Sequence, residues 1–180
     1  MTSLAGAVLF HLLTGLAGYV YAVFLEWFVH KYIFHELGKR KGSRFRFHYA
    51  DHHKATRRHD GGDPAFEGSV VSWNAYGREF WFIMLGIVLH TPLLLVAPAF
   101  FIVSALSGLN YHRMHRKSHL DPEWCKEHMP WHWDHHMGDR EASNANWCVT
   151  CEWFDKLMGT RVPGSPEARA ELQQEVARDL

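Results

Sequence analysis

Two long apolar segments limit what this chain of 180 residues can fold into. Residues 4–29 contain one acidic residue and no Lys or Arg, and residues 80–111 contain no charged residue at all. A helix needs about 20 apolar residues to cross a bilayer, because it rises about 1.5 Å per residue. The first segment is long enough for one crossing, and it lacks the basic start and the cleavage site of a signal peptide. We therefore predict an integral membrane protein.

The second apolar segment is too long for one ordinary span and short for two. Pro92 and Pro98 interrupt it, and Thr91-Pro92 predicts a turn because proline disfavours helix at the preceding residue. We expect a tight helical hairpin here. Basic residues follow the first span and follow the hairpin, but none lies at the N-terminus or at the hairpin tip. The positive-inside tendency therefore places residues 31–79 and 112–180 on the cytoplasmic side.

The predicted fold class is an all-α membrane bundle, with one N-terminal span, a helical hairpin and a histidine-rich helical cap on the cytoplasmic face. The cap comprises residues 31–79 and 112–161, so residues 1–161 form one domain, and residues 162–180 form a polar tail. The alternative is a soluble bundle in which the same apolar helices are buried. The 19 basic residues balance the 19 acidic ones, which argues against nucleic acid as a partner.

Histidine is the second unusual feature, with 15 residues of this type. Ten of them form four motifs beside the apolar segments: His30 and His35; His48, His52 and His53; His115 and His119; His132, His135 and His136. Helical positions i, i+3 and i+4 share a face, so we expect three sets of imidazoles each to aim at one point: His48 with His52, His115 with His119, and His132 with His135 and His136. The five-residue spacing of the first motif requires a helix end or a local distortion.

The remaining histidines fit other roles. His11 and His90 lie inside apolar segments, where helix packing or an interfacial position is expected, and His59 and His128 fit positions near the site or on the surface. His112 shares a helical stripe with the third motif, so its role stays open. Cys148 and Cys151 form a C-x-x-C without the strand-helix context of a redox motif or the second pair of a zinc site.

The early and late motifs can meet only if the chain crosses the membrane an even number of times between His53 and His115, which the hairpin provides. Ten imidazoles exceed the needs of one tetrahedral zinc ion, whereas two ions with about five nitrogen ligands each would use them all. Imidazole suits Fe, Zn, Cu and Ni alike. Ligand histidines usually donate their second ring N–H to an acceptor, for which Glu26, Asp51 and Asp134 are candidates.

The four motifs, in this order around a membrane hairpin, resemble the fatty acid hydroxylase/sterol desaturase superfamily of membrane di-iron enzymes. The resemblance covers residues 22–161 and continues into a closing segment, Asn146 to Thr150 and Trp153 to Thr160. Three residues of that segment fit the family pattern: Asp155, Gly159 and Thr160. Three others depart from it, namely Cys148, Phe154 and Met158, and these departures concern packing positions.

The resemblance implies that the ten motif histidines bind two iron ions, which zinc can replace in purified protein, and that O2 is the co-substrate. It implies a monooxygenase that hydroxylates a membrane lipid. Asn146 and Asp155 join the three candidate carboxylates as residues that support the ligands. Two electrons would come from a separate ferredoxin or cytochrome b5-type donor with its reductase, because His59-Asp-Gly-Gly lacks the proline of the cytochrome b5 haem motif.

Several functions remain in competition. The closing WFDKLMGT sequence favours a fatty acyl substrate, whereas HKYIFH in the first motif is also similar to the carotenoid β-ring hydroxylases. A sterol oxidase or desaturase would share the same fold. Outside the enzymes, the chain could be a histidine-rich metal-binding or transport protein. A transporter would place its ionisable residues near the bilayer midplane, and here the motifs lie outside the spans.

Overall fold

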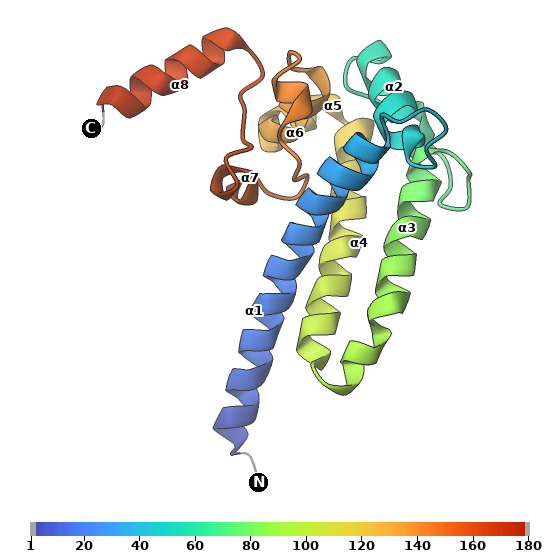
Figure 1. The fold of residues 1–180 in the computed structure, drawn as a ribbon, viewed down its shortest axis with the longest axis vertical. Helices are drawn as coiled ribbons and strands as arrows, with labels where there is room; N and C mark the ends of the chain where they lie inside the picture. The colour runs from blue at the N-terminus through green and yellow to red at the C-terminus, as the bar shows by residue number, and fades with distance from the viewer. Residues whose placement is uncertain (1–2, 179–180) are drawn as a thin grey trace.

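The computed structural model describes residues 3–178, and every regular element in that range is helical. Helix α1 (Leu4–Phe28) continues without a break into the π-helical segment η1 (Val29–Leu37). Helices α3 (Ala75–His90) and α4 (Pro98–Leu120) form a hairpin through the 3-10 turn η4 (Thr91–Leu95). Figure 1 shows α1 running alongside this hairpin. The predicted all-helical fold and the predicted turn at Pro92 are therefore confirmed.

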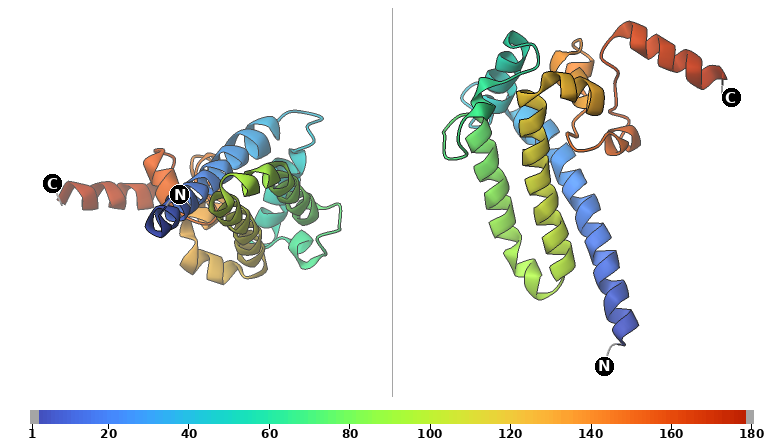
Figure 2. Two further views of the ribbon diagram at one scale, coloured as in Figure 1. Left: turned by 90° about the horizontal axis from the view of Figure 1, so that it is seen from below. Right: turned by 180° about the vertical axis from the view of Figure 1, so that it is seen from behind.

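The shorter elements gather at one end of the three long helices, opposite the N-terminus, as both Figure 1 and Figure 2 show. From here on, the cap means residues 29–79 and 112–161; it begins two residues before the predicted cap so as to include all of η1. Its elements are η1, η2 (Phe47–His52), α2 (His53–Arg58), η3 (Pro64–Glu67), the last turns of α4, α5 (Pro122–His128), α6 (Pro130–Met137), η5 (Ala142–Asn144) and α7 (Trp153–Leu157). Helix α8 (Pro166–Arg178) follows outside it. The predicted domain boundary at residue 161 stays a prediction.

Close packing of α1 against α4 depends on glycine. A Cβ atom at Gly18 would lie 2.5 Å from the carbonyl oxygen of Phe100, so only glycine lets the two backbones approach this closely. At the cap end of α1, the Glu26 carboxylate accepts hydrogen bonds from Thr150, with its backbone nitrogen at 2.8 Å and its hydroxyl at 2.7 Å. These contacts fix α1 to the hairpin and to the closing segment.

The segments Leu4–Leu37 and Ala75–Leu95 are long and apolar enough to cross a membrane. Only 11% and 6% of their most apolar windows are buried inside the protein. Large apolar side chains point outward along them, including Leu16 at 62% and Leu89 at 68% exposure. Core helices of a soluble bundle would bury these side chains, so the structure argues against that alternative.

Candidate metal centre

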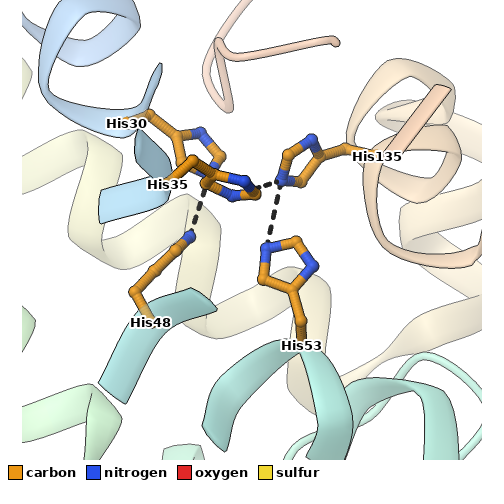
Figure 3. Close-up of side chains that lie close together, drawn as sticks. All are labelled: His30, His35, His48, His53 and His135. Atoms are coloured by element: carbon orange, nitrogen blue, oxygen red, sulfur yellow. Dashed lines mark hydrogen bonds between the residues drawn. The ribbon is translucent and has the colours of Figure 1, made fainter. Parts of the chain in front are cut away.

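The structure brings all ten motif histidines together inside the cap, where each is at most 8% exposed. They form two groups of converging imidazoles. In the first group, one ring nitrogen from each member lies within 4.8 Å of all the others; its members are His30, His35, His48, His53 and His135 (Figure 3). The second group meets the same criterion with His52, His115, His119 and His136. His132 adjoins the second group, with its Nε2 3.3 Å from Nε2 of His119.

Helix geometry explains the first group. His30 and His35 are five residues apart, and η1 is a π-helix, whose i→i+5 hydrogen bonds bring such residues onto one side. The local distortion expected at this motif is therefore present. The π-helical η2 ends at His52, and here too residues five apart, His48 and His53, fall in the same group. The expected pairing of His48 with His52 is wrong, because it assumed α-helical spacing.

Each of the two His-His pairs divides between the groups. His53 and His135 belong to the first group, whereas their neighbours His52 and His136 belong to the second. Successive residues of a helix point about 100° apart, so one His-His pair can reach two adjacent centres. The groups meet where the rings of His53 and His136 lie 4.3 Å apart between centroids. The expectation that His132, His135 and His136 aim at one point is therefore also wrong.

Distances between the inward nitrogens match those of ligands around a metal ion. Nε2 of His48 lies 2.9 Å from Nε2 of His30, and Nε2 of His135 lies 3.2 Å from both His35 and His53. With metal–nitrogen bonds of about 2.0–2.1 Å, two ligands lie about 2.9 Å apart at a right angle and about 3.3 Å apart at a tetrahedral angle. The donor spacing therefore fits an ion in the first group, and the His119–His132 distance fits one in the second.

Outward ring nitrogens are held by carbonyl oxygens. Nδ1–H donates to the oxygen of Trp147 from His30 (2.6 Å), to Ala145 from His135 (2.7 Å) and to Gly61 from His119 (3.0 Å). A proton on Nδ1 leaves Nε2 with a free lone pair, which is the form that binds a metal. In three rings from three motifs, the backbone thus selects the tautomer that directs a lone pair into the groups.

Burial favours the neutral form of six of these imidazoles. It lowers the pKa of His135 to about 3, and it lowers the pKa values of His48, His53, His119, His132 and His136 well below their ordinary range. Within residues 3–178, several inward nitrogens have no hydrogen-bond partner, including Nε2 of His52, His115 and His136. Buried polar atoms without partners are costly, and a metal ion would satisfy them.

An apolar cavity of about 470 Å³ runs from the cap between α1, α3 and α4. Its walls include Val23, Phe82, Ile83 and Ile87, and at the cap end they include His30 and Glu79. The ring of His30 therefore belongs to the first histidine group and also lines the cavity. The arrangement can hold an apolar chain beside the converging imidazoles.

A comparison with known protein families agrees with this architecture. The model of the fatty acid hydroxylase family matches residues 15–160. The chain belongs to the fatty acid hydroxylase family. Together with the two candidate spans, this indicates a membrane protein with the activity of a hydroxylase, an oxidoreductase. No curated protein and no solved structure matches the chain.

Two carboxylates of this fatty acid hydroxylase family member contact the histidines directly, and the sequence reasoning missed both. Asp63 accepts from Nδ1 of His52 at 2.6 Å, and Glu79 accepts from Nδ1 of His115 at 2.7 Å. Glu79 also accepts from Nδ1 of His112 at 3.1 Å, which places that histidine beside the second group rather than in it. Glu79 lies one residue before the apolar segment 80–111, and a carboxylate at that boundary is the sequence feature that could have indicated its role.

The five residues predicted to support the ligands lie elsewhere, and among residues 3–178 none of their side chains hydrogen-bonds the imidazole of a motif histidine. Asp51 is exposed, and Asp134 pairs with Arg161 at 2.9 Å. Glu26, Asn146 and Asp155 instead shape the closing segment. Asp155 accepts from the backbone nitrogens of residues 147 and 148, at 2.9 and 2.8 Å, and Asn146 adopts a φ of 58°. The closing segment that these residues shape supplies the carbonyls of residues 145 and 147, which accept hydrogen bonds from His135 and His30.

The other histidines lie outside both groups, as expected. His11, His59 and His128 are exposed. His90 lies at the far end of α3, where it hydrogen-bonds Tyr21. Cys148 is buried in an apolar cluster with Val23 and Trp27, and neither Cys148 nor Cys151 belongs to a histidine group.

Proposed function

We propose that this protein is a membrane oxygenase whose ten motif histidines hold two iron ions and which hydroxylates a C–H bond of a lipid, with a fatty acyl chain as the expected substrate. One observation carries the proposal. His30 belongs to a histidine group and also lines the apolar cavity between the membrane helices. A hydrocarbon chain in that cavity would therefore have a carbon beside the imidazoles.

Iron, when bound, would supply the activation of O2 with two electrons and the transfer of one oxygen atom to carbon. The chain's own residues prepare the site for this chemistry. Carbonyls of residues 61, 145 and 147 and the carboxylates of Asp63 and Glu79 hold Nδ1–H, so that Nε2 faces inward. The cavity walls are mostly apolar and therefore favour a hydrocarbon beside the imidazoles.

Iron is favoured over a structural zinc ion by the number and kind of donors. Two adjoining groups offer nitrogen donors only, and no cysteine belongs to either group. Structural zinc sites are closed and four-coordinate, and they need neither ten imidazoles nor an apolar cavity. Imidazole also binds zinc well, so we expect purified protein to contain some zinc.

Topology and electron supply are part of the same proposal. The basic residues that follow α1 and α4 support a cytoplasmic cap, with α1 and the hairpin crossing or entering the bilayer. The chain carries no recognisable electron-carrier domain in residues 3–178, so we expect a separate ferredoxin or cytochrome b5-type donor. That donor would approach the cap from the aqueous side.

Lipid mass spectrometry of cells grown in air with added iron tests the function. Cells that produce the protein should gain a lipid heavier by one oxygen atom, and growth under 18O2 should place the label in it. His135→Ala should abolish the product, because His135 contacts two members of the first group. His128→Ala is the matched control, since this exposed histidine lies outside both groups. Identical lipid profiles from wild type and His135→Ala would refute the proposal.

A further inference from the structure

The apolar cavity contains a polar pair at the end remote from the metal centre. The hydroxyl of Tyr21 lies 2.8 Å from Nε2 of His90, and both side chains line the same cavity as His30. Nδ1 of His90 lies 2.7 Å from the carbonyl oxygen of Gly86. Ionisable side chains inside membrane helices are costly and usually mark a binding function. The hydroxylase chemistry proposed above makes no use of this pair.

The hydrogen bonds of the pair determine what it can bind. A carbonyl oxygen only accepts, so the nitrogen of His90 that faces Gly86 carries the proton. A neutral imidazole then has an accepting Nε2, and the hydroxyl of Tyr21 donates its hydrogen to that atom. The hydroxyl hydrogen of Tyr21 is thereby engaged in the hydrogen bond to His90, whereas the hydroxyl oxygen retains lone pairs that can accept. The pair can accept a hydrogen bond from a ligand but cannot donate one.

The position of the pair sets a distance. Glu79, which holds His115 at the metal centre, and His90 lie on the same helix, α3. They are separated by eleven residues, or about 16 Å at the helical rise, which an extended chain of roughly a dozen carbons would cover. The apolar cavity reaches both residues, so a single extended ligand can contact the pair and the metal centre together.

We propose that the oxygen of Tyr21, fixed by His90, binds the hydroxyl group of a long-chain lipid whose hydrocarbon extends through the cavity to the histidine groups. The assignment of this ligand as a substrate rests on the proposed function, whereas the binding site itself does not. On this basis the enzyme acts on a chain that already carries a hydroxyl group at its far end, and oxidises it about a dozen carbons away.

The binding test needs neither metal nor O2. The full chain in detergent is given an equimolar mixture of 1-dodecanol and its methyl ether, and native mass spectrometry measures the ratio of the two bound ligands. The ether keeps the chain and the oxygen but lacks the donor. Since one hydrogen bond decides between them, wild type should favour the alcohol about 3- to 10-fold over the ratio seen with Tyr21→Phe. Tyr19→Phe is the matched control, because Tyr19 lines the same cavity and its hydroxyl accepts from Trp153.

A second variant tests the direction of the hydrogen bond. His90→Leu releases the hydroxyl hydrogen of Tyr21, which can then donate to the ether oxygen. The preference for the alcohol should therefore fall in this variant through a gain in bound ether. Equal ratios in wild type and Tyr21→Phe, or an unchanged ratio in His90→Leu, would overturn the proposal. If wild-type protein prefers the alcohol as expected but produces no hydroxylated lipid in cells, the proposed function alone is refuted.

Discussion

Replacement of Glu79 by glutamine should weaken metal binding without disturbing the inward nitrogens themselves. The carboxylate is 1% exposed and accepts from Nδ1 of His115 at 2.7 Å and of His112 at 3.1 Å. A glutamine carbonyl can accept from one ring, but its NH2 group would face the N–H of the other. Loss of one hydrogen bond to a buried charged group costs about 1.5–3 kcal/mol, or about 10- to 100-fold in metal affinity.

Metal content measured by elemental mass spectrometry, after equilibration with a series of chelator concentrations, gives the affinity of each variant. Glu67→Gln is the matched control, because Glu67 is exposed and lies outside the metal centre. The control should retain wild-type affinity, and Glu79→Gln should release metal at a chelator concentration about 10- to 100-fold lower. A shift of less than about twofold for Glu79→Gln would refute the view that its charge holds His115 for the metal.

Three further predictions concern stability, measured as the Tm of metal-free protein in detergent. Burial lowers the pKa of His135 from 6.5 to about 3, so on acidification this imidazole is protonated at a higher pH in the unfolded chain than in the folded protein. The free energy of unfolding should therefore fall as the pH drops from 7 toward 3, by up to about 1.4 kcal/mol per pH unit for each such histidine. A Tm that stays constant or rises on acidification would contradict this. Gly61→Ala combines a φ of 96° with a Cβ atom that would overlap the ring of Trp133, and it should cost about 3 kcal/mol. Gly42→Ala, at a φ of 80° with nothing within 4 Å, should cost about 1 kcal/mol. Equal losses of stability in the two variants would show that the Trp133 ring moves aside without cost. Asp155→Asn leaves fewer acceptors for three donors and should cost about 2 kcal/mol, and an unchanged Tm would show that the closing segment is held by other contacts.

The sequence predicted the long elements well because they depend on local properties. Two long apolar segments and Pro92 were sufficient to place α1, the hairpin and its turn. The histidine motifs were sufficient to predict that early and late parts of the chain meet. These features depend on hydropathy and on proline geometry, which are properties of a few neighbouring residues.

The details of the site depended on contacts between distant residues. Which histidines share a group follows from π-helical backbone at His35 and His48, and the sequence reasoning assumed α-helical spacing. Asp63 is oriented by the 3-10 turn that it caps, and Glu79 by the first turns of α3. Proximity in sequence favoured Asp51 and Asp134, but the partner of an imidazole is set by how the elements pack. Hydropathy carries no information about that packing.

The division of each His-His pair between the two groups has a consequence for biosynthesis. The first group joins His35 to His135, which are 100 residues apart, and the second group needs ligands from the same late helix. Neither group can therefore be completed before α6 has emerged from the ribosome and has packed against the earlier elements. Because adjacent residues serve both centres, an ion that settles in one group also positions the backbone of the other. Metal binding should therefore occur late in synthesis and at both groups together. A chain truncated before His132 should leave the ribosome with neither histidine group complete.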